Sequence, residues 1–305
     1  MSSQPNNNQN SDSGGEYIVE RKMVIKDPFW SRNIGEDVEL TNGQKFGLVC
    51  CPCCVGPCRS EERKNDFQKM KKLFMFWVTI VDLIYFVIEL FACGFASPSK
   101  NATLGPPSSC LNDLGARDSE KIVSGHVYRL IVPVIMHSGF IHIFFNLFVQ
   151  VRVCFAFETV WGTKNTAIIY IVSGVGGNLL STIMGWEYIS VGASGAICGL
   201  FGARLIEIIV TWNKTQEQIR KINLIQCVLV LILVTVIGLI GSIDFGAHFG
   251  GVLYGIAVSS VLFAENYDQP TKKKKLKIFG YVFLSLLTVL FVILIGTVTR
   301  NRFKN

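Results

Sequence analysis

The chain has 305 residues, of which 50% are hydrophobic and only 17% are charged, whereas an ordinary soluble domain has about 25% charged residues. Together with a mean hydropathy of +0.41, this composition excludes a disordered chain and argues against a soluble enzyme. The net charge of +7 would suggest nucleic-acid binding in a soluble protein, but in a membrane protein it first concerns topology.

The first 72 residues precede any long apolar stretch, and we predict that they form a separate cytosolic region. Residues 1–15 are rich in Asn, Ser and Gln and are expected to be disordered. The start of the chain is polar and the first apolar segment begins only near residue 73, so no cleavable signal peptide is expected. The first span is therefore predicted to remain as a membrane anchor.

This N-terminal region contains a cluster of five cysteines. A cysteine cluster beside a basic stretch on the cytosolic side favours S-palmitoylation. Cys51 and Cys54 have a CxxC spacing, but no separate second pair follows along the chain, which is poor support for zinc. A metal site and free thiols both remain open alternatives. The lipidation candidates are Cys50, Cys51, Cys53, Cys54 and Cys58.

Seven later stretches are apolar and close to the ~20 residues that a helix needs to cross a bilayer core. They predict an all-α, polytopic membrane protein with a membrane domain over residues 73–299 and a short lumenal or extracellular tail over 300–305. Asp82 and Glu89 lie seven residues apart on one face of the first helix and are expected to face other helices. The predicted helices are 73–95, 128–151, 164–184, 190–211, 222–241, 244–264 and 278–298.

The basic residues predict which side of the membrane each connection faces. If the N-terminus is cytosolic, 22 of the 29 Lys and Arg residues lie on the cytosolic side, as the positive-inside rule requires. The basic run 272–277 fits this rule, with contact to anionic lipid as the alternative. The loop 96–127 then lies outside, where Asn101 begins a glycosylation sequon and Cys93 and Cys110 could either pair or remain free thiols.

Polar groups inside these spans point to chemistry. Gly192–Gly195 surrounds Ser194 with small residues, which by itself favours close helix packing. However, Ser194 and His248 are each predicted about four residues into a helix that enters from the outer side, at a depth of ~6 Å. A serine beside a histidine base is an activated nucleophile, so the matching depth favours catalysis over packing.

Other residues would complete such a site. His142 and Asn146 share one face of the second helix and could donate hydrogen bonds to an oxyanion, as could the backbone N–H of Ser194. Apart from Asp244, no acidic residue is expected at a comparable depth, so a dyad is predicted rather than a triad. The four histidines have no carboxylate at metal-ligand spacing, and we expect neither a metal nor a cofactor.

These residues resemble the rhomboid intramembrane serine proteases over about residues 73–300. The resemblance covers the second-helix motif, the nucleophile motif, the base helix, a Trp-Arg loop motif with Tyr in place of Trp, and a Glu-xxx-Gly pattern. The stretch that follows the serine is most similar to secretory-pathway rhomboids, which add a seventh helix to a six-helix core. The residues that carry these motifs are His137, His142, Asn146, Gly192, Ser194, Gly195, His248, Gly251, Gly255, Tyr128, Arg129, Glu158 and Gly162.

The resemblance implies that Ser194 is the nucleophile and His248 the general base, with His142, Asn146 and the Ser194 amide as the oxyanion hole. It implies cleavage of single-pass membrane proteins in or near their spans, in contact with membrane lipids, in the secretory pathway or plasma membrane. Cys198 departs from the family, which often has a tyrosine there that stacks on the base. The oligomeric state and the substrate stay open.

Two other functions compete with proteolysis. A catalytically silent rhomboid-like protein would bind membrane clients and route them without cleaving them. A transporter would use the intramembrane carboxylates Asp82, Glu89 and Glu158 as pathway groups.

Gly251 and Gly255 are predicted to allow the close helix contact that brings Ser194 to His248.

Overall fold

The computed structural model of the chain describes residues 70–185, 188–239, 244–299 and 301. These residues are mostly helical and contain no strand, only one isolated bridge between Arg117 and Ser190. The predicted all-α class is therefore confirmed. The cysteine cluster at 50–58, the rest of residues 1–69 and most of the predicted tail lie outside the described residues.

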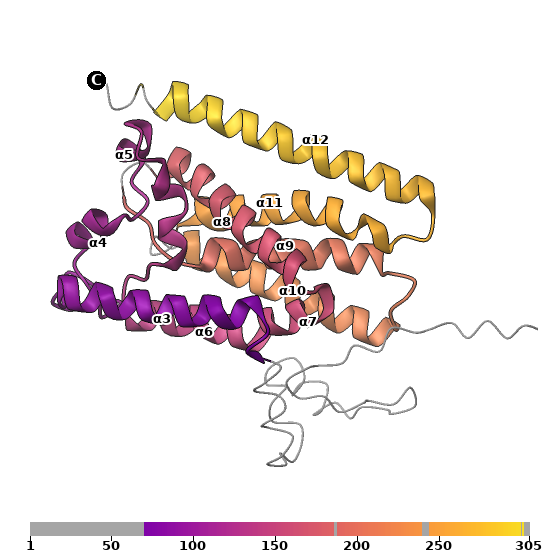
Figure 1. Cartoon of the computed structure of the whole chain (residues 1–305), viewed down its shortest axis with the longest axis horizontal. Coiled ribbons are helices and arrows are strands. Elements are labelled where there is room, and N and C mark those ends of the chain that lie inside the picture. The colour runs from indigo at the N-terminus through magenta and orange to yellow at the C-terminus, as the bar shows by residue number, and fades with distance from the viewer. Residues whose placement is uncertain (1–69, 186–187, 240–243, 300, 302–305) are drawn as a thin grey trace, which may run out of the picture.

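Long helices form a bundle, and short helices lie at one end of it beside the last turns of the chain (Figure 1). The short helices are α4 (Ser108–Leu114) and α5 (Ser119–Val123), followed by 3-10 turns at Val127–Leu130 and Val132–Ile135. The longer helices are α3 (Phe74–Cys93), α6 (Phe140–Val149), α8 (Thr163–Met184), α9 (Ser194–Val210), α10 (Glu217–Leu239), α11 (Phe245–Leu262) and α12 (Pro270–Leu294). Helix α7 (Phe155–Trp161) has seven residues and continues the segment that α6 begins.

Five helical segments in the described part of the chain are long and apolar enough to cross a membrane. This finding supports a polytopic membrane protein, and α9 and α10 occupy the places predicted for the fourth and fifth spans. The segments that qualify are Phe74–Cys93, Phe140–Trp161, Thr163–Met184, Phe245–Asn266 and Pro270–Thr297.

The predicted start of the second helix was wrong. Residues 128–139 form 3-10 turns and a connection, and α6 begins only at Phe140. Pro133 cannot donate a backbone hydrogen bond and interrupts a regular helix, and Gly139 before α6 is extended, with φ 166°. The helix then continues through a π-helical turn, Gln150–Cys154, to the end of α7, so that Glu158 lies in this second span.

Three other predicted helix starts differ from the structure. The fifth helix, α10, begins at Glu217, five residues before its predicted start at 222. The fourth helix begins at Ser194 rather than at residue 190, because Gly192 has φ +133° and holds the preceding segment out of a helix. The last helix begins at Pro270, eight residues before its predicted start. Proline is favoured in the first turn of a helix, and the basic run 272–277 therefore belongs to α12.

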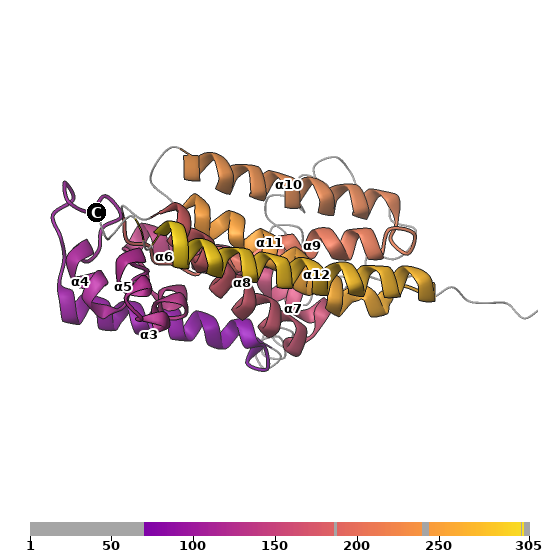
Figure 2. The ribbon, with the colours of Figure 1, turned by 90° about the horizontal axis from the view of Figure 1, so that it is seen from above.

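Helix α11 is the centre of the bundle, since it packs against α8 and α9 and is covered by α12 (Figures 1 and 2). Its candidate span, Phe245–Asn266, is 67% buried inside the protein, whereas that of α12 is only 17% buried. Helix α10 packs against α9 and α11. The base helix of the predicted site is therefore enclosed, while α12 exposes most of its surface.

Glycines allow α11 to lie close to its neighbours. A Cβ atom on Gly255 would overlap the carbonyl oxygen of Gly199 on α9, and one on Gly177 of α8 would overlap that of Ala247. This is the backbone contact that the glycine pattern predicts, and small residues at helix interfaces are what permit it.

Carboxylates fix α3 against the second span. Glu158 accepts hydrogen bonds from the backbone N–H groups of Phe74 (2.6 Å) and Met75 (2.8 Å), which are otherwise unpaired donors at the start of α3. Asp82 accepts from the side-chain amide of Gln150 (2.8 Å), which the π-helical turn brings to α3. Asp82 and Glu89 are both fully buried. Asp82 faces the second span as predicted, whereas Glu89 accepts from the backbone N–H of His137 in the connection before α6.

A disulfide between Cys93 and Cys110 joins the end of α3 to α4. The sequence left this pair open between a disulfide and two free thiols, and the structure forms the bond. It closes a loop at the end of the bundle where α4 and α5 lie (Figure 1).

Candidate active site

The hydroxyl of Ser194 and the imidazole of His248 form a direct hydrogen bond. Ser194 is the first residue of α9 and His248 is the fourth residue of α11, and their Oγ and Nε2 atoms lie 2.7 Å apart. His248 is buried and Ser194 is half-buried. Two helices that are distant in sequence thus bring together a hydroxyl and a group able to accept its proton.

The predicted depths of Ser194, His142 and Asn146 within their helices were wrong. Ser194 does not lie four residues into its helix but begins it, because α9 starts later than predicted. His142 and Asn146 do not lie deep in a long helix either, since they are the third and seventh residues of α6. The shift in α6 therefore brings His142 to the same end of the bundle as the Ser194–His248 pair.

Gly192 brings His142 close to Ser194. A Cβ atom on Gly192 would lie 2.7 Å from Cε1 and 2.9 Å from Nε2 of His142, and 3.6 Å from Oγ of Ser194. The backbone N–H of Gly192 donates to the carbonyl oxygen of Pro133 (2.8 Å), which ties this segment to the connection before α6. The Nε2 edge of His142 and the serine hydroxyl therefore border the same space.

Donors at the start of α9 border this space as well. The residue before α9 is Ala193, whose side chain cannot cap the helix, so the first backbone N–H groups lack a side-chain acceptor there. These groups and the positive end of the helix dipole favour a negative charge near Ser194. Asn146 is buried, and its amide donates to the carbonyl oxygen of His142 (3.1 Å).

The Nδ1 atom of His248 is buried without a hydrogen-bond partner in the described part of the chain. Asp244, which was the only acidic residue in reach by sequence, directs its carboxylate elsewhere. It accepts from the N–H of Ala247 (3.0 Å), from the hydroxyl of Ser181 and from the guanidinium of Arg117 (3.4 Å). Among the described residues the arrangement is a serine–histidine pair without an acidic third member.

Arg117 was not singled out from the sequence, yet it connects the segment between α4 and α5 to both halves of the pair. Its backbone exchanges hydrogen bonds with Ser190 (2.9 and 3.0 Å), shortly before Ser194, and its side chain pairs with Asp244, shortly before His248. Burial lowers the pKa of the Arg117 guanidinium from its ordinary value, and the Asp244 carboxylate opposes this shift.

Three further residues singled out from the sequence, Arg129, His137 and Cys198, lie close to the pair or to the loop before α6. Arg129 donates to the carbonyl oxygen of Ala116 (2.6 Å) and lies over the ring of Tyr128. His137 is fully buried with its ring 5.4 Å from that of His142, and neither ring nitrogen has a partner among the described residues. Cys198 is buried one helical turn after Ser194.

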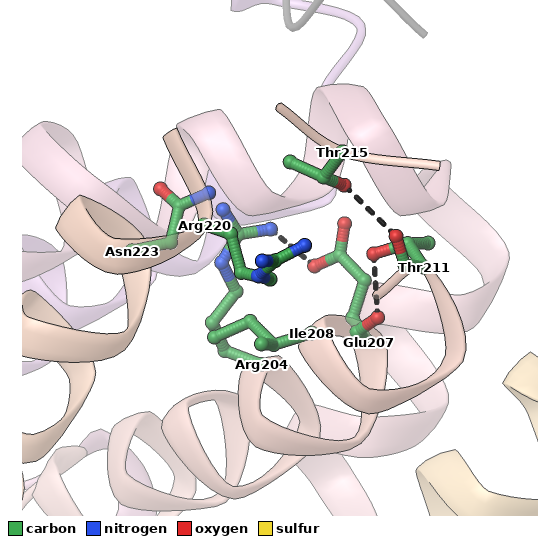
Figure 3. A pocket seen from close by; sticks show the side chains of 7 residues that line it. All are labelled: Arg204, Glu207, Ile208, Thr211, Thr215, Arg220 and Asn223. Carbon is green, nitrogen blue, oxygen red and sulfur yellow. Dashed lines mark hydrogen bonds and ion pairs between the residues drawn. The ribbon is translucent and has the colours of Figure 1, made fainter. Parts of the chain in front are cut away.

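A second cluster of polar side chains lies toward the other end of α9 (Figure 3). Arg204 and Glu207 form an ion pair, and the indole N–H of Trp161 donates to the same carboxylate (2.7 Å). Glu207 is 13 residues from Ser194, which is about 20 Å along a helix. The pair could have been found from its i, i+3 spacing in an apolar helix. The pocket residues are Arg204, Glu207, Ile208, Thr211, Thr215, Arg220 and Asn223.

The fold and this site define a polytopic helical membrane protein with a serine–histidine pair enclosed at one end of its bundle. The family model of the Rhomboid domain matches residues 124–265. The chain is 30% identical over 225 residues to Rhomboid-like protease 2 of Toxoplasma gondii, covering 73% of this chain and 77% of the relative. The chain belongs to the rhomboid family.

Other relatives match over a smaller share of their length. Identity is 33% over 195 residues to Rhomboid-like protease 1 of Toxoplasma gondii, covering 63% of this chain and 64% of the relative. It is 37% over 164 residues to RHOMBOID-like protein 6, mitochondrial, of Arabidopsis thaliana, covering 53% of each. The chain thus spans between about half and two thirds of these two relatives.

Proposed function

We propose that the chain is an intramembrane serine endopeptidase that cleaves single-pass membrane proteins within or near their spans. The observation that carries the proposal is the 2.7 Å hydrogen bond between Ser194 Oγ and His248 Nε2, which lie in the first turns of α9 and α11. Membership of a family in which relatives are named proteases supports it.

In this mechanism His248 accepts the hydroxyl proton at Nε2 while Ser194 Oγ attacks the scissile carbonyl carbon. The carbonyl oxygen becomes an oxyanion in the space between Gly192, His142 and the start of α9. His142 Nε2–H and the Ser194 N–H donate to it there, with Asn146 as the remaining proposed donor. His248 then gives its proton to the leaving amine, which releases one product and leaves an ester on Ser194.

Water completes the reaction. His248 accepts a proton from water as the water oxygen attacks the ester carbonyl, and the proton returns to Ser194 Oγ as the acid product leaves. No acidic side chain in the described residues pairs with Nδ1 of His248. The orientation of the His248 imidazole therefore depends on the packing of α11. The glycine contacts with α8 and α9 supply that packing.

The Cys93–Cys110 disulfide supports the proposed orientation. Disulfides persist in oxidising compartments, so the end of the bundle with α4 and α5 would face the lumen or the cell exterior. The start of α12 carries the basic run 272–277 at the other end, as the positive-inside rule favours for the cytosol. We therefore propose that the protein resides in the secretory pathway or the plasma membrane.

The test is cleavage of a model single-pass substrate in reconstituted membranes. Wild type is expected to release product, and Ser194→Ala is expected to release none above background. Ser260→Ala is the matched control, because Ser260 lies on α11 and donates only within its own helix, to the carbonyl oxygen of Ile256 (2.7 Å). Equal product from wild type and Ser194→Ala would contradict proteolysis by Ser194. No product from either, with binding retained, would favour the silent client-binding protein.

A further inference from the structure

The loop between α3 and α4 contacts the start of α6 through the side chains of Asn101 and Thr103 and through backbone carbonyl groups. We call residues 97–106 the strap. The strap lies inside the loop that the Cys93–Cys110 disulfide closes, and the N–H of Ala96 donates to the carbonyl oxygen of Gly105 (2.9 Å) across its base. None of its residues belongs to the serine–histidine pair or to the oxyanion donors.

Asn101 uses its whole hydrogen-bonding capacity in this structure. Its side-chain amide donates to the carbonyl oxygens of Pro106 (2.8 Å) and Ser138 (2.7 Å). Its side-chain oxygen accepts from the N–H (2.9 Å) and the hydroxyl (2.6 Å) of Thr103. An asparagine side chain has two donors and accepts two bonds, so Asn101 is saturated and its orientation is fixed.

The strap also supplies the missing cap of α6. No side chain caps this helix, and the N–H groups of Phe140 and Ile141 donate to the carbonyl oxygens of Leu104 (3.1 Å) and Thr103 (3.2 Å). A Cβ atom on Gly139 would overlap the Thr103 carbonyl. The strap therefore determines where the backbone of α6 begins, two residues before His142.

Ser138 connects the strap to the imidazole of His142. The N–H of Ser138 donates to Nδ1 of His142 (3.4 Å), and the Ser138 hydroxyl lies 3.0 Å from the same atom. A backbone N–H can only donate, so Nδ1 is an acceptor, and a neutral imidazole with Nδ1 as acceptor carries its proton on Nε2. Nε2 is the atom that faces Gly192 and Ser194.

We propose that Asn101 is a positioning residue, which holds Ser138 through the strap so that His142 presents an Nε2–H donor to the oxyanion. The proposal rests on the proposed function for its catalytic consequence. It also gives the Asn101–Thr103 sequon a structural role. A glycan on the amide of Asn101 would replace one of its two N–H donors and remove one of these hydrogen bonds.

The kinetic test compares Asn101→Asp with Asn165→Asp, the same substitution at the start of α8, where the amide donates only to the carbonyl oxygen of Trp161 (3.0 Å). Asn101→Asp should lower kcat about 10- to 100-fold and leave KM unchanged. The largest loss expected is that caused by removing one oxyanion donor. Its affinity for a tetrahedral boronate peptide should fall by the same factor. Asn165→Asp should leave kcat and KM unchanged, and Thr103→Ser, which keeps the hydroxyl, should retain activity that Thr103→Val loses.

A second measurement does not require proteolysis. The ¹⁵N chemical shifts of the His142 ring, assigned by comparison with His142→Gln, should show the Nε2–H tautomer in the wild type and a mixture of tautomers in Asn101→Asp. An Nδ1–H tautomer in the wild type, an unchanged tautomer in Asn101→Asp, or a glycan on Asn101 in fully active protein would each overturn the proposal. If no form of the protein cleaves substrate, the proposed function fails while the tautomer result still decides the positioning role.

Discussion

Gly251 of α11 lies so close to α9 that a Cβ atom on it would overlap the carbonyl oxygen of Gly195. Gly195 directly follows Ser194, and Gly251 lies three residues after His248, so the two glycines face each other beside the hydrogen-bonded pair. The distance between the two helix backbones at this point therefore helps to set the distance between Oγ and Nε2.

Substitution of Gly251 by valine should separate the two helices and reduce proteolysis at least 10-fold. The obstructing atoms belong to the backbone and cannot rotate away, and overpacking of this kind typically costs about 1–3 kcal/mol. Gly296→Val is the matched control, since nothing lies within 4 Å of a Cβ atom there. Product release in membranes measures activity, and protease protection of the loops measures insertion. Full activity in Gly251→Val would contradict the packing argument.

Gly192 is the glycine that borders His142, and alanine there should lower kcat while the protein still inserts and binds substrate. Its φ of +133° is strained for any other residue, and the new Cβ atom would lie 2.7 Å from the His142 ring. Displacing one oxyanion donor costs about 10²–10³ in kcat.

The control for Gly192→Ala is Gly125→Ala, where φ is +106° but no atom lies within 4 Å of the added Cβ. Backbone strain alone would lower stability in both variants and leave their kcat values alike. A loss of kcat confined to Gly192→Ala would come from contact of the new Cβ atom with His142. Equal kcat values in the two variants would contradict a role for His142 in stabilising the oxyanion.

The disulfide should contribute to stability at the end of the bundle that holds α4 and α5. Cys93 and Cys110 are 17 residues apart, and closing a loop of this length restricts the unfolded chain by about 3 kcal/mol. Cys93→Ser/Cys110→Ser should therefore unfold at a lower temperature in detergent than wild type. Reductant should lower the unfolding temperature of wild type toward that of the double variant and leave the double variant unchanged; an equal response of both would exclude this disulfide as the cause.

The sequence predicted the helical class and the residues of the serine–histidine pair, because both depend on local patterns. Apolar stretches of bilayer length identify the spans, and the residue spacing in each motif identifies Ser194, His248 and His142. The predicted starts of α6, α9 and α12 were wrong, since Pro133, Gly192 and Pro270 act through backbone geometry that hydropathy does not record.

The supporting contacts could not be read from the sequence because they join distant segments. Ser138 precedes α6 without any motif of its own, and Asn101 was noticed only as a sequon, while Arg117 was counted as one of many loop cations. Asn101 reaches Ser138, 37 residues away, and Arg117 reaches Asp244, 127 residues away. The Cys93–Cys110 pair shows the same limit, since sequence alone leaves pairing and free thiols equally open.

Glu158 provides a last prediction, on the stability of the first span. Its two carboxylate oxygens accept from Phe74 N–H and Met75 N–H, and Glu158→Gln would replace one acceptor by an amide donor facing a backbone N–H. Leaving a buried donor unpaired costs about 1–3 kcal/mol, so the unfolding temperature in detergent should fall. Glu265→Gln is the matched control, because Glu265 pairs with Lys273 and Lys277 at the exposed surface and such pairs contribute little. If both substitutions lowered the unfolding temperature equally, the Glu158 carboxylate would not be the group that fixes the start of α3.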